Sequence, residues 1–268
     1  MGQQLDLNDL VLTKEPELDL KAFVQATELG NPAFSVDQST RAARAPVSMS
    51  PDEEQAFIND RSLVSFATGV SASKRWDVLD SILFAQLAAD KKYELHTDTF
   101  EWYSRYHEVL RTLGWVTETN LFANKEIQNS AMEVKDEIVA ILSAAFGGIA
   151  IAPLVLKVLE SIKKLGDKDG NIIAFKKSTT KDEKGAFQIA YAMETDGLVT
   201  MLSGIFKITA TNVLTQVLFF KSSKDFTGVS YNVSKNTFQE TAFSSVREMV
   251  IEKLGTRRRS AVAELELP

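Results

Sequence analysis

The chain has 268 residues and a formal net charge of −6, with 44% apolar and 25% charged residues. These values are typical of a folded globular protein and exclude a chain that is disordered throughout. The acidic balance argues against a dedicated nucleic-acid binder and against simple electrostatic attraction to anionic lipid. The absence of cysteine excludes disulfides, thiolate nucleophiles and cysteine-ligated metal centres.

The first 49 residues are polar and are interrupted by Pro, Ser and Arg, which predicts an arm or propeptide. Residues 18–29 within it could hold one or two helical turns. No basic segment followed by an apolar run opens the chain, so we expect no standard secretory signal. We therefore expect a protein made in soluble form and released, if at all, by a leaderless route.

Capping signals and helical periodicity dominate the next part of the chain. Ser50-Pro51-Asp52-Glu53 is a capping box with Pro at the first helical position. Ser73 and Thr97 or Asp98 are further helix starts, and apolar residues follow them at helical spacing. These signals predict helices over 51–67, 74–91 and 98–113, and then a short strand over 115–122.

The most apolar stretch runs from Ile138 to Leu156 without a charged residue. Its length just reaches that of a membrane-spanning helix. Gly147-Gly148 and Pro153 interrupt it, however, and favour two helices joined by a bend. Three interpretations stay open: a helix pair covering a sheet, a transmembrane helix, and a segment that is soluble in one state and membrane-associated in another.

From about residue 171 the apolar period changes from helical to alternating, which is typical of strands. Gly166–Ile172 is expected to be a turn, because Leu165 and Lys176 stand where a calcium loop needs its ligands. The alternation predicts strands over 186–193, 198–210, 213–221 and 226–234, and then a helix over 236–254. The sequence therefore predicts an α+β protein, with helices followed by an antiparallel meander.

No catalytic, cofactor-binding or metal-binding motif is present, and we predict a protein that is not an enzyme and carries no cofactor or metal. His96 and His107 are the two histidines, and no nucleophile stands at helical spacing from them. Arg257-Arg258-Arg259 follows the last expected helix. It is either a frayed terminus with cations near a helix end or a protease site, and Arg44 in the arm invites the second interpretation.

Three segments of the strand region resemble the Cyt family of cytolytic δ-endotoxins. They are Gly204–Ala210, Gln216–Phe220 and Ser230–Val233, in the family's order and at close to its spacing. The apolar segment Met132–Leu165 is similar to the long helix that precedes these strands in the family. The resemblance covers about residues 132–250.

The resemblance implies one α+β domain over 50–255, a central antiparallel sheet wrapped by helices, between the arm (1–49) and a removable basic tail (256–268). It implies a protoxin that is trimmed near Arg44 and near Arg257, Arg258 and Arg259, binds membrane phospholipid and self-oligomerises on it. It also allows a dimer in the soluble form. The residues expected to insert into the membrane are Leu198, Val199, Met201, Ile205, Phe206, Ile208, Val217, Leu218, Phe219 and Phe220.

The sequence thus predicts a cytolytic toxin that acts at target-cell membranes, by pores or by detergent-like disruption after a conformational opening. Two strands of near 9–11 residues fit such a role. One alternative is a non-lytic protein of the same fold that binds a lipid or small ligand between helices and sheet. The other is an enzyme whose site the linear sequence conceals.

Overall fold

The computed structural model describes residues 19–33, 47–127, 133–146, 151–165, 169–218 and 227–268. The strands are β1 (Gln55–Asn59), β2 (Ser62–Phe66), β3 (Trp115–Ile127), β4 (Thr180–Lys181), β5 (Lys184–Thr195), β6 (Leu198–Ala210), β7 (Thr227–Phe238) and β8 (Val262–Leu265). The helices are α1 (Leu20–Ala26), α3 (Ala72–Asp90), α4 (Thr99–Thr112), α5 (Val134–Ala145), α6 (Ile151–Leu165), α7 (Gly170–Thr179), α8 (Glu240–Ser244), α9 (Arg247–Leu254) and α10 (Thr256–Ala261).

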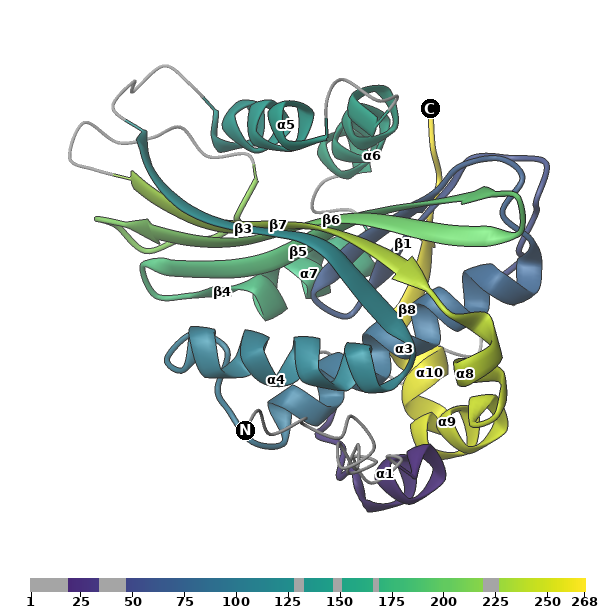
Figure 1. Ribbon diagram of the computed structural model, residues 1–268. Coiled ribbons are helices and arrows are strands. Elements are labelled where there is room, and N and C mark those ends of the chain that lie inside the picture. Colours follow the sequence, from purple (N-terminus) through teal and green to yellow (C-terminus); the bar gives the residue numbers. More distant parts are fainter. Residues whose placement is uncertain (1–18, 34–46, 128–132, 147–150, 166–168, 219–226) are drawn as a thin grey trace, which may run out of the picture.

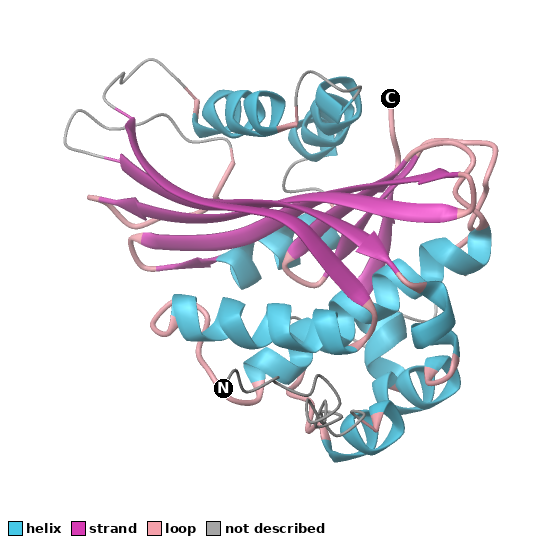
Figure 2. Cartoon of the chain, in the orientation of Figure 1, coloured by secondary structure: helices cyan, strands magenta, loops and turns pink. Residues whose placement is uncertain are grey.

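All the described strands belong to one sheet, ordered β3-β7-β6-β5-β2-β1-β8, with β4 paired to β5 off this path. Figure 1 shows α5 and α6 over one face of the sheet and α3, α4 and the C-terminal helices against the other. Figure 2 shows the same three layers by type of structure. The predicted α+β class is confirmed. The sheet is mixed, however, because β2 pairs with β5 in parallel while the other pairs are antiparallel.

Several predicted elements are confirmed. The helices α3 and α4, the strand β3 and the hairpin of β5 and β6 lie where periodicity placed them, and β6 has the predicted bounds. The apolar stretch is divided into α5 and α6, as its glycines and proline suggested. No helix within the described ranges is both long enough and apolar enough to span a bilayer.

The predicted helix over 51–67 is wrong, because these residues form the hairpin of β1 and β2. Asp60 takes a left-handed backbone conformation (φ 53°) at the turn, which Asp tolerates better than most residues. The side chain of Gln55 explains why the capping box is not used: its Oε1 accepts from the Ser50 N–H and from Nη1 of Arg75. Every residue of both strands is buried, so burial on both faces outweighed the local helix signal.

The predictions of a turn over 166–172 and of a strand over 213–221 are also wrong where the structure describes these residues. Residues 170–179 form α7, which Asp169 caps by accepting from the N–H groups of Asn171 and Ile172 at 2.7 and 3.2 Å. Residues 213–218 form no strand, and the rest of the predicted strand over 213–221 lies outside the described residues. The apolar side chains of Leu214, Val217 and Leu218 instead pack into the core beneath α5 and α6.

The C-terminal part of the chain also differs from the prediction. Residue 236 belongs to β7, which extends to Phe238, and the predicted single helix is divided into α8 and α9. The segment predicted as a tail forms α10 and β8, and β8 pairs with β1 from Val262 to Leu265. A frayed terminus is therefore wrong for residues 256–265, since they supply one edge of the sheet.

Apolar side chains fill the spaces on both sides of the sheet, and β6 shows this alternation most clearly. Val199, Met201 and Ile205 point into the core shared with α3 and α4. Leu202, Phe206 and Ile208 point into the core shared with α5 and α6. Strands that are buried on both faces carry apolar residues at successive positions, which explains the imperfect alternation of the sequence.

Two glycines allow neighbouring side chains to approach the sheet closely. A Cβ at Gly204 would lie 2.7 Å from Cδ2 of Leu142 in α5, and a Cβ at Gly185 would lie 2.5 Å from Cγ1 of Val217. Real Cβ atoms do not come so close, so both positions need glycine for the layer above them to pack.

We expect that a chain ending at Ala261, which lacks β8, unfolds at a markedly lower temperature than a control chain ending at Glu266. Loss of β8 removes Val262 and Leu265 from the two cores, and burial of such side chains is worth about 1.5–3 kcal/mol each. Thermal unfolding followed by circular dichroism measures the difference. Equal melting temperatures would show that β8 contributes nothing to the fold.

Candidate functional site

Both histidines are held in the neutral form near neutral pH. His96 and His107 are on or next to α4. Burial lowers the pKa of His96, and burial lowers that of His107 to about 4. Within the described ranges no group of acidic and histidine side chains could hold a metal ion. The remaining candidate sites are the buried polar networks, the helix layers and a cavity.

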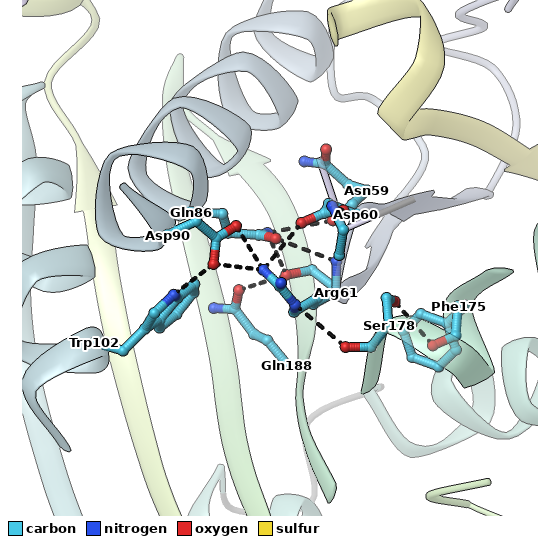
Figure 3. A network of polar contacts seen from close by, with 11 residues as sticks. Asn59, Asp60, Arg61, Gln86, Asp90, Trp102, Phe175, Ser178 and Gln188 are labelled. Carbon is cyan, nitrogen blue, oxygen red and sulfur yellow. Dashed lines mark hydrogen bonds and ion pairs between the residues drawn. The ribbon is translucent and has the colours of Figure 1, made fainter. Parts of the chain in front are cut away.

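A buried polar network joins the turn between β1 and β2 to α3, α4 and α7 (Figure 3). Nη1 of Arg61 contacts both carboxylate oxygens of Asp90, at 2.7 and 2.6 Å, and Nε donates to the carbonyl of Ser178 at 3.3 Å. Nε1 of Trp102 in α4 donates to the same carboxylate at 2.7 Å. Gln86 in α3 donates to the carbonyl of Asn59 and to the hydroxyl of Ser62. We call these residues the Arg61 network.

The charges of the Arg61 network compensate each other. Burial alone would lower the pKa of Arg61, but Asp60 and Asp90 outweigh it and the pKa is raised. The guanidinium therefore stays charged and neutralises two carboxylates. The groups in contact here are ion-pair and hydrogen-bond partners, and none is a nucleophile beside a base. The network can position helices on the sheet, and we assign it that structural role.

We expect Arg61→Ala to lower the free energy of unfolding by about 3–5 kcal/mol, because removing one partner leaves buried carboxylates without compensation. Arg61→Lys keeps the charge but loses the bond to Ser178, so a smaller loss is expected. Arg259→Ala, at an exposed arginine, is the control and should stay within about 0.5 kcal/mol of the wild type. Urea denaturation gives all three values, and a neutral Arg61→Ala would contradict the assignment.

Two further ion pairs connect α3 to the C-terminal helices. The guanidinium of Arg247 contacts both carboxylate oxygens of Asp77 at 2.7 Å, and Nε of Arg258 contacts Oδ1 of Asp80 at 2.6 Å. The Arg258 guanidinium also stacks on the ring of Trp76, 4.0 Å from its centroid. Asp80 is only 1% exposed, and its Oδ2 has no hydrogen-bond partner among the residues that the structure describes.

Burial raises the pKa of Asp80 from 3.8 to about 6, although Arg258 partly offsets the shift. The folded state therefore binds the proton more tightly than the unfolded state, and the ionised carboxylate lowers stability at neutral pH. The stabilising contribution of this proton is complete below pH 3.8 and is lost as the pH rises through about 6.

We expect the wild type to gain up to about 3 kcal/mol of stability over Asp80→Asn when the pH falls from 7.5 to 4, since each pKa unit is worth about 1.4 kcal/mol. Urea denaturation of both proteins across this range measures the difference, in which other titrating groups cancel. A difference that does not change with pH would show that Asp80 titrates normally.

The layer formed by α5 and α6 rests on the sheet chiefly through aliphatic side chains. Its buried residues share one face of each helix: Val134, Ile138, Ile141 and Leu142 in α5, and Leu154, Val155, Val158, Leu159 and Ile162 in α6. The described polar contacts to the rest of the protein are few. Glu137 pairs with Lys125, and Lys157 pairs with Glu54 at 2.6 Å on the surface. Ser161 donates to the carbonyl of Glu266 at 2.6 Å.

The residues expected to insert into a membrane do not form one exposed surface. Leu198 is 47% exposed at the end of the hairpin between β5 and β6, whereas the five candidates later in β6 are buried, three beneath α3 and α4 and two beneath α5 and α6. Val217 and Leu218 are buried in the loop after β6. Phe219 and Phe220 lie outside the described residues.

The candidate processing residues lie in different environments. Arg44 lies outside the described residues. Arg257, Arg258 and Arg259 form part of α10, between α9 and β8, and Arg258 is held by Asp80. A cut within α10 would therefore separate β8 from the rest of the chain.

A cavity of about 380 Å³ lies between α4 and the strands β3, β6 and β7. Its lining comes from four elements: Thr99, Phe100, Tyr103, Ala123, Asn124, Ile205, Lys207, Ser230, Tyr231 and Asn232. Of these residues, Ile205 is the one that the sequence predicts as a site residue. Exposed Phe100, next to the start of a helix, was the one available signal, since the other residues come together only when the strands pair.

Among the comparisons with known proteins, only the one with solved structures gives matches. No protein-family model and no curated protein sequence matches the chain. A structure described as a delta-endotoxin matches with a TM-score of 0.41 and 9% identity, covering 73% of this chain and 86% of the other. The Evf virulence factor matches with a TM-score of 0.37 and 11% identity, over 87% and 88% of the two chains.

The activated Cyt2Ba monomer from Bacillus thuringiensis subsp. israelensis matches with a TM-score of 0.29 and 13% identity, over 49% of this chain and 77% of the other. None of these three proteins is described as an enzyme.

Proposed function

We propose that this protein is a membrane-acting cytolysin: it binds membrane lipid and permeabilises the bilayer after the layer of α5 and α6 separates from the sheet. The observation that supports this is a block of long antiparallel strands beneath a helical layer with few polar attachments. Four neighbouring strands, β3, β7, β6 and β5, have 12 or 13 residues each. A tilted strand needs about 9–11 residues to cross the hydrocarbon of a bilayer.

The energetics of the layer support an opening that needs a membrane. Each large aliphatic side chain between the layer and the sheet is worth about 1.5–3 kcal/mol when buried. Separation in water would expose many of them at once and is prohibitive. A bilayer offers the same side chains another apolar environment, and the exposed ion pair of Lys157 with Glu54 adds little resistance. The pair of Glu137 with Lys125 opposes the separation more strongly, because the Glu137 carboxylate is buried.

The proposal extends to the partners and the route. Membrane phospholipid is the expected partner, nucleic acid is not, and several copies are expected to assemble on the membrane by pairing their strands, because backbone groups in hydrocarbon need internal partners. Trimming at Arg44 or at Arg257–Arg259 is part of the proposal as an activating step. The protein would act at target-cell membranes after release.

A disulfide between α5 and β6 tests the opening. A Cβ at Gly204 lies 2.7 Å from a methyl carbon of Leu142 that is two bonds from that residue's own Cβ. The two Cβ atoms are therefore at most about 5 Å apart, and a disulfide needs roughly 3.5–4.5 Å between them. We expect oxidised Leu142→Cys/Gly204→Cys to release no dye from phosphatidylcholine liposomes and to recover leakage on reduction.

The controls for this experiment separate locking from damage. The chain has no native cysteine, so no competing disulfide forms. The Phe206 ring comes as close to the new Cβ as Leu142 does, and the reduced double variant measures any disturbance that this causes. Unchanged leakage with the disulfide verified by mass spectrometry would contradict the opening. A wild type that never causes leakage, before or after limited trypsin, would contradict the cytolysin itself.

A second function is supported by the cavity beneath α4. A space of about 380 Å³ between helix and sheet is within the range of about 300–1,000 Å³ for small-molecule sites. A non-lytic protein of this fold would bind a lipid or other small ligand there and would associate with its ligand without permeabilising liposomes.

A further inference from the structure

We propose that the cavity between α4 and the sheet binds a single-chain amphiphile with an anionic head, held by Lys207, and with its apolar body against Phe100, Tyr103 and Ile205. This inference rests on the second proposed function, ligand binding at this cavity, and adds the chemical class of the ligand. The apolar lining and its one charge support it.

The positive charge of the lining favours a ligand with a negative charge. Lys207 is the one charged residue among those that line the cavity. It forms no ion pair with any residue that the structure describes, and its Nζ lies 5.2 Å from the centroid of the Phe100 ring. A cation against an aromatic face is held in place but is not neutralised. An anionic group is therefore the complement that the cavity lacks.

The walls select an apolar body. Phe100, Tyr103 and Ile205 line the cavity from the helix and the sheet, and Phe100 is 62% exposed to solvent. An exposed aromatic side chain beside a lysine without an ion-pair partner is common at the entrance of a ligand-binding pocket and uncommon in a protein core. A ligand with a charged end and an apolar end fits this distribution better than a small polar anion.

Isothermal titration with three amphiphiles of equal chain length tests the ligand class. The probes are dodecanoate, dodecanol and dodecyltrimethylammonium, each as the monomer. We expect dodecanoate to bind at least tenfold more tightly than the other two. Lys207→Gln should remove this preference and Lys207→Arg should keep it. Lys184→Gln, at an exposed strand lysine outside the lining, should leave the affinity unchanged.

Phe100→Ser tests the apolar wall at an exposed position, so folding should be unaffected, and it should weaken dodecanoate and dodecanol alike. Equal binding of the three probes by the wild type would overturn the anionic head but would leave ligand binding at the cavity intact. No binding of any probe would overturn the second function together with this inference. Leakage from liposomes reports separately on the cytolysin proposal.

Discussion

The structure depends on one constraint. The sheet presents apolar side chains on both faces, so each face must be covered by a layer of helices. In β6 successive residues point alternately into the two cores, so neither face could be left in water. A sheet of this kind is stable only between two layers. The helices α3 and α4 and the C-terminal helices cover one face, and α5 with α6 covers the other. The strands that the chain adds at its two ends then extend the same sheet on one side.

The two helical layers are attached to the sheet by different kinds of contact. On the side of α3 and α4, the Arg61 network and the pairs of Asp77 and Asp80 with arginines fix the helices by directional, mostly buried contacts. The small side chains of Ala186, Ala190 and Ala192 on this face of β5 let the helices come close. On the side of α5 and α6, non-directional aliphatic packing predominates. Aliphatic surface can exchange one apolar partner for another, whereas a buried ion pair cannot be transferred to lipid. This asymmetry is why the opening is assigned to α5 and α6.

The cavity lies on the directionally fixed side, beneath the N-terminal half of α4. A site that must keep its shape for a ligand benefits from rigid walls, and Tyr103 belongs to the same helix as Trp102, which bonds Asp90 in the Arg61 network. The two proposed functions, membrane permeabilisation and ligand binding, therefore draw on opposite faces of one sheet.

The sequence by itself determined the helices and strands whose apolar periodicity matches the way their side chains are buried in the fold. The helices α3, α4, α5 and α6 and the hairpin of β5 and β6 follow from it, and with them the α+β class. The cavity could not be read in this way, because its ten lining residues come from four elements and meet only through strand register.

Tertiary structure decided the segments in which local signals and burial disagree. Residues 55–66 follow a capping box but become two strands, because both faces of each strand are buried and the Arg75 side chain donates to Gln55. The apolar run at 213–218 fills the space that Gly185 leaves open and forms no strand. The basic segment at the C-terminus becomes α10 and β8, since the edge of β1 offers its backbone groups hydrogen-bond partners and Asp80 offers Arg258 a charge. These partners lie many residues away along the chain, and no pattern of neighbouring residues reports them.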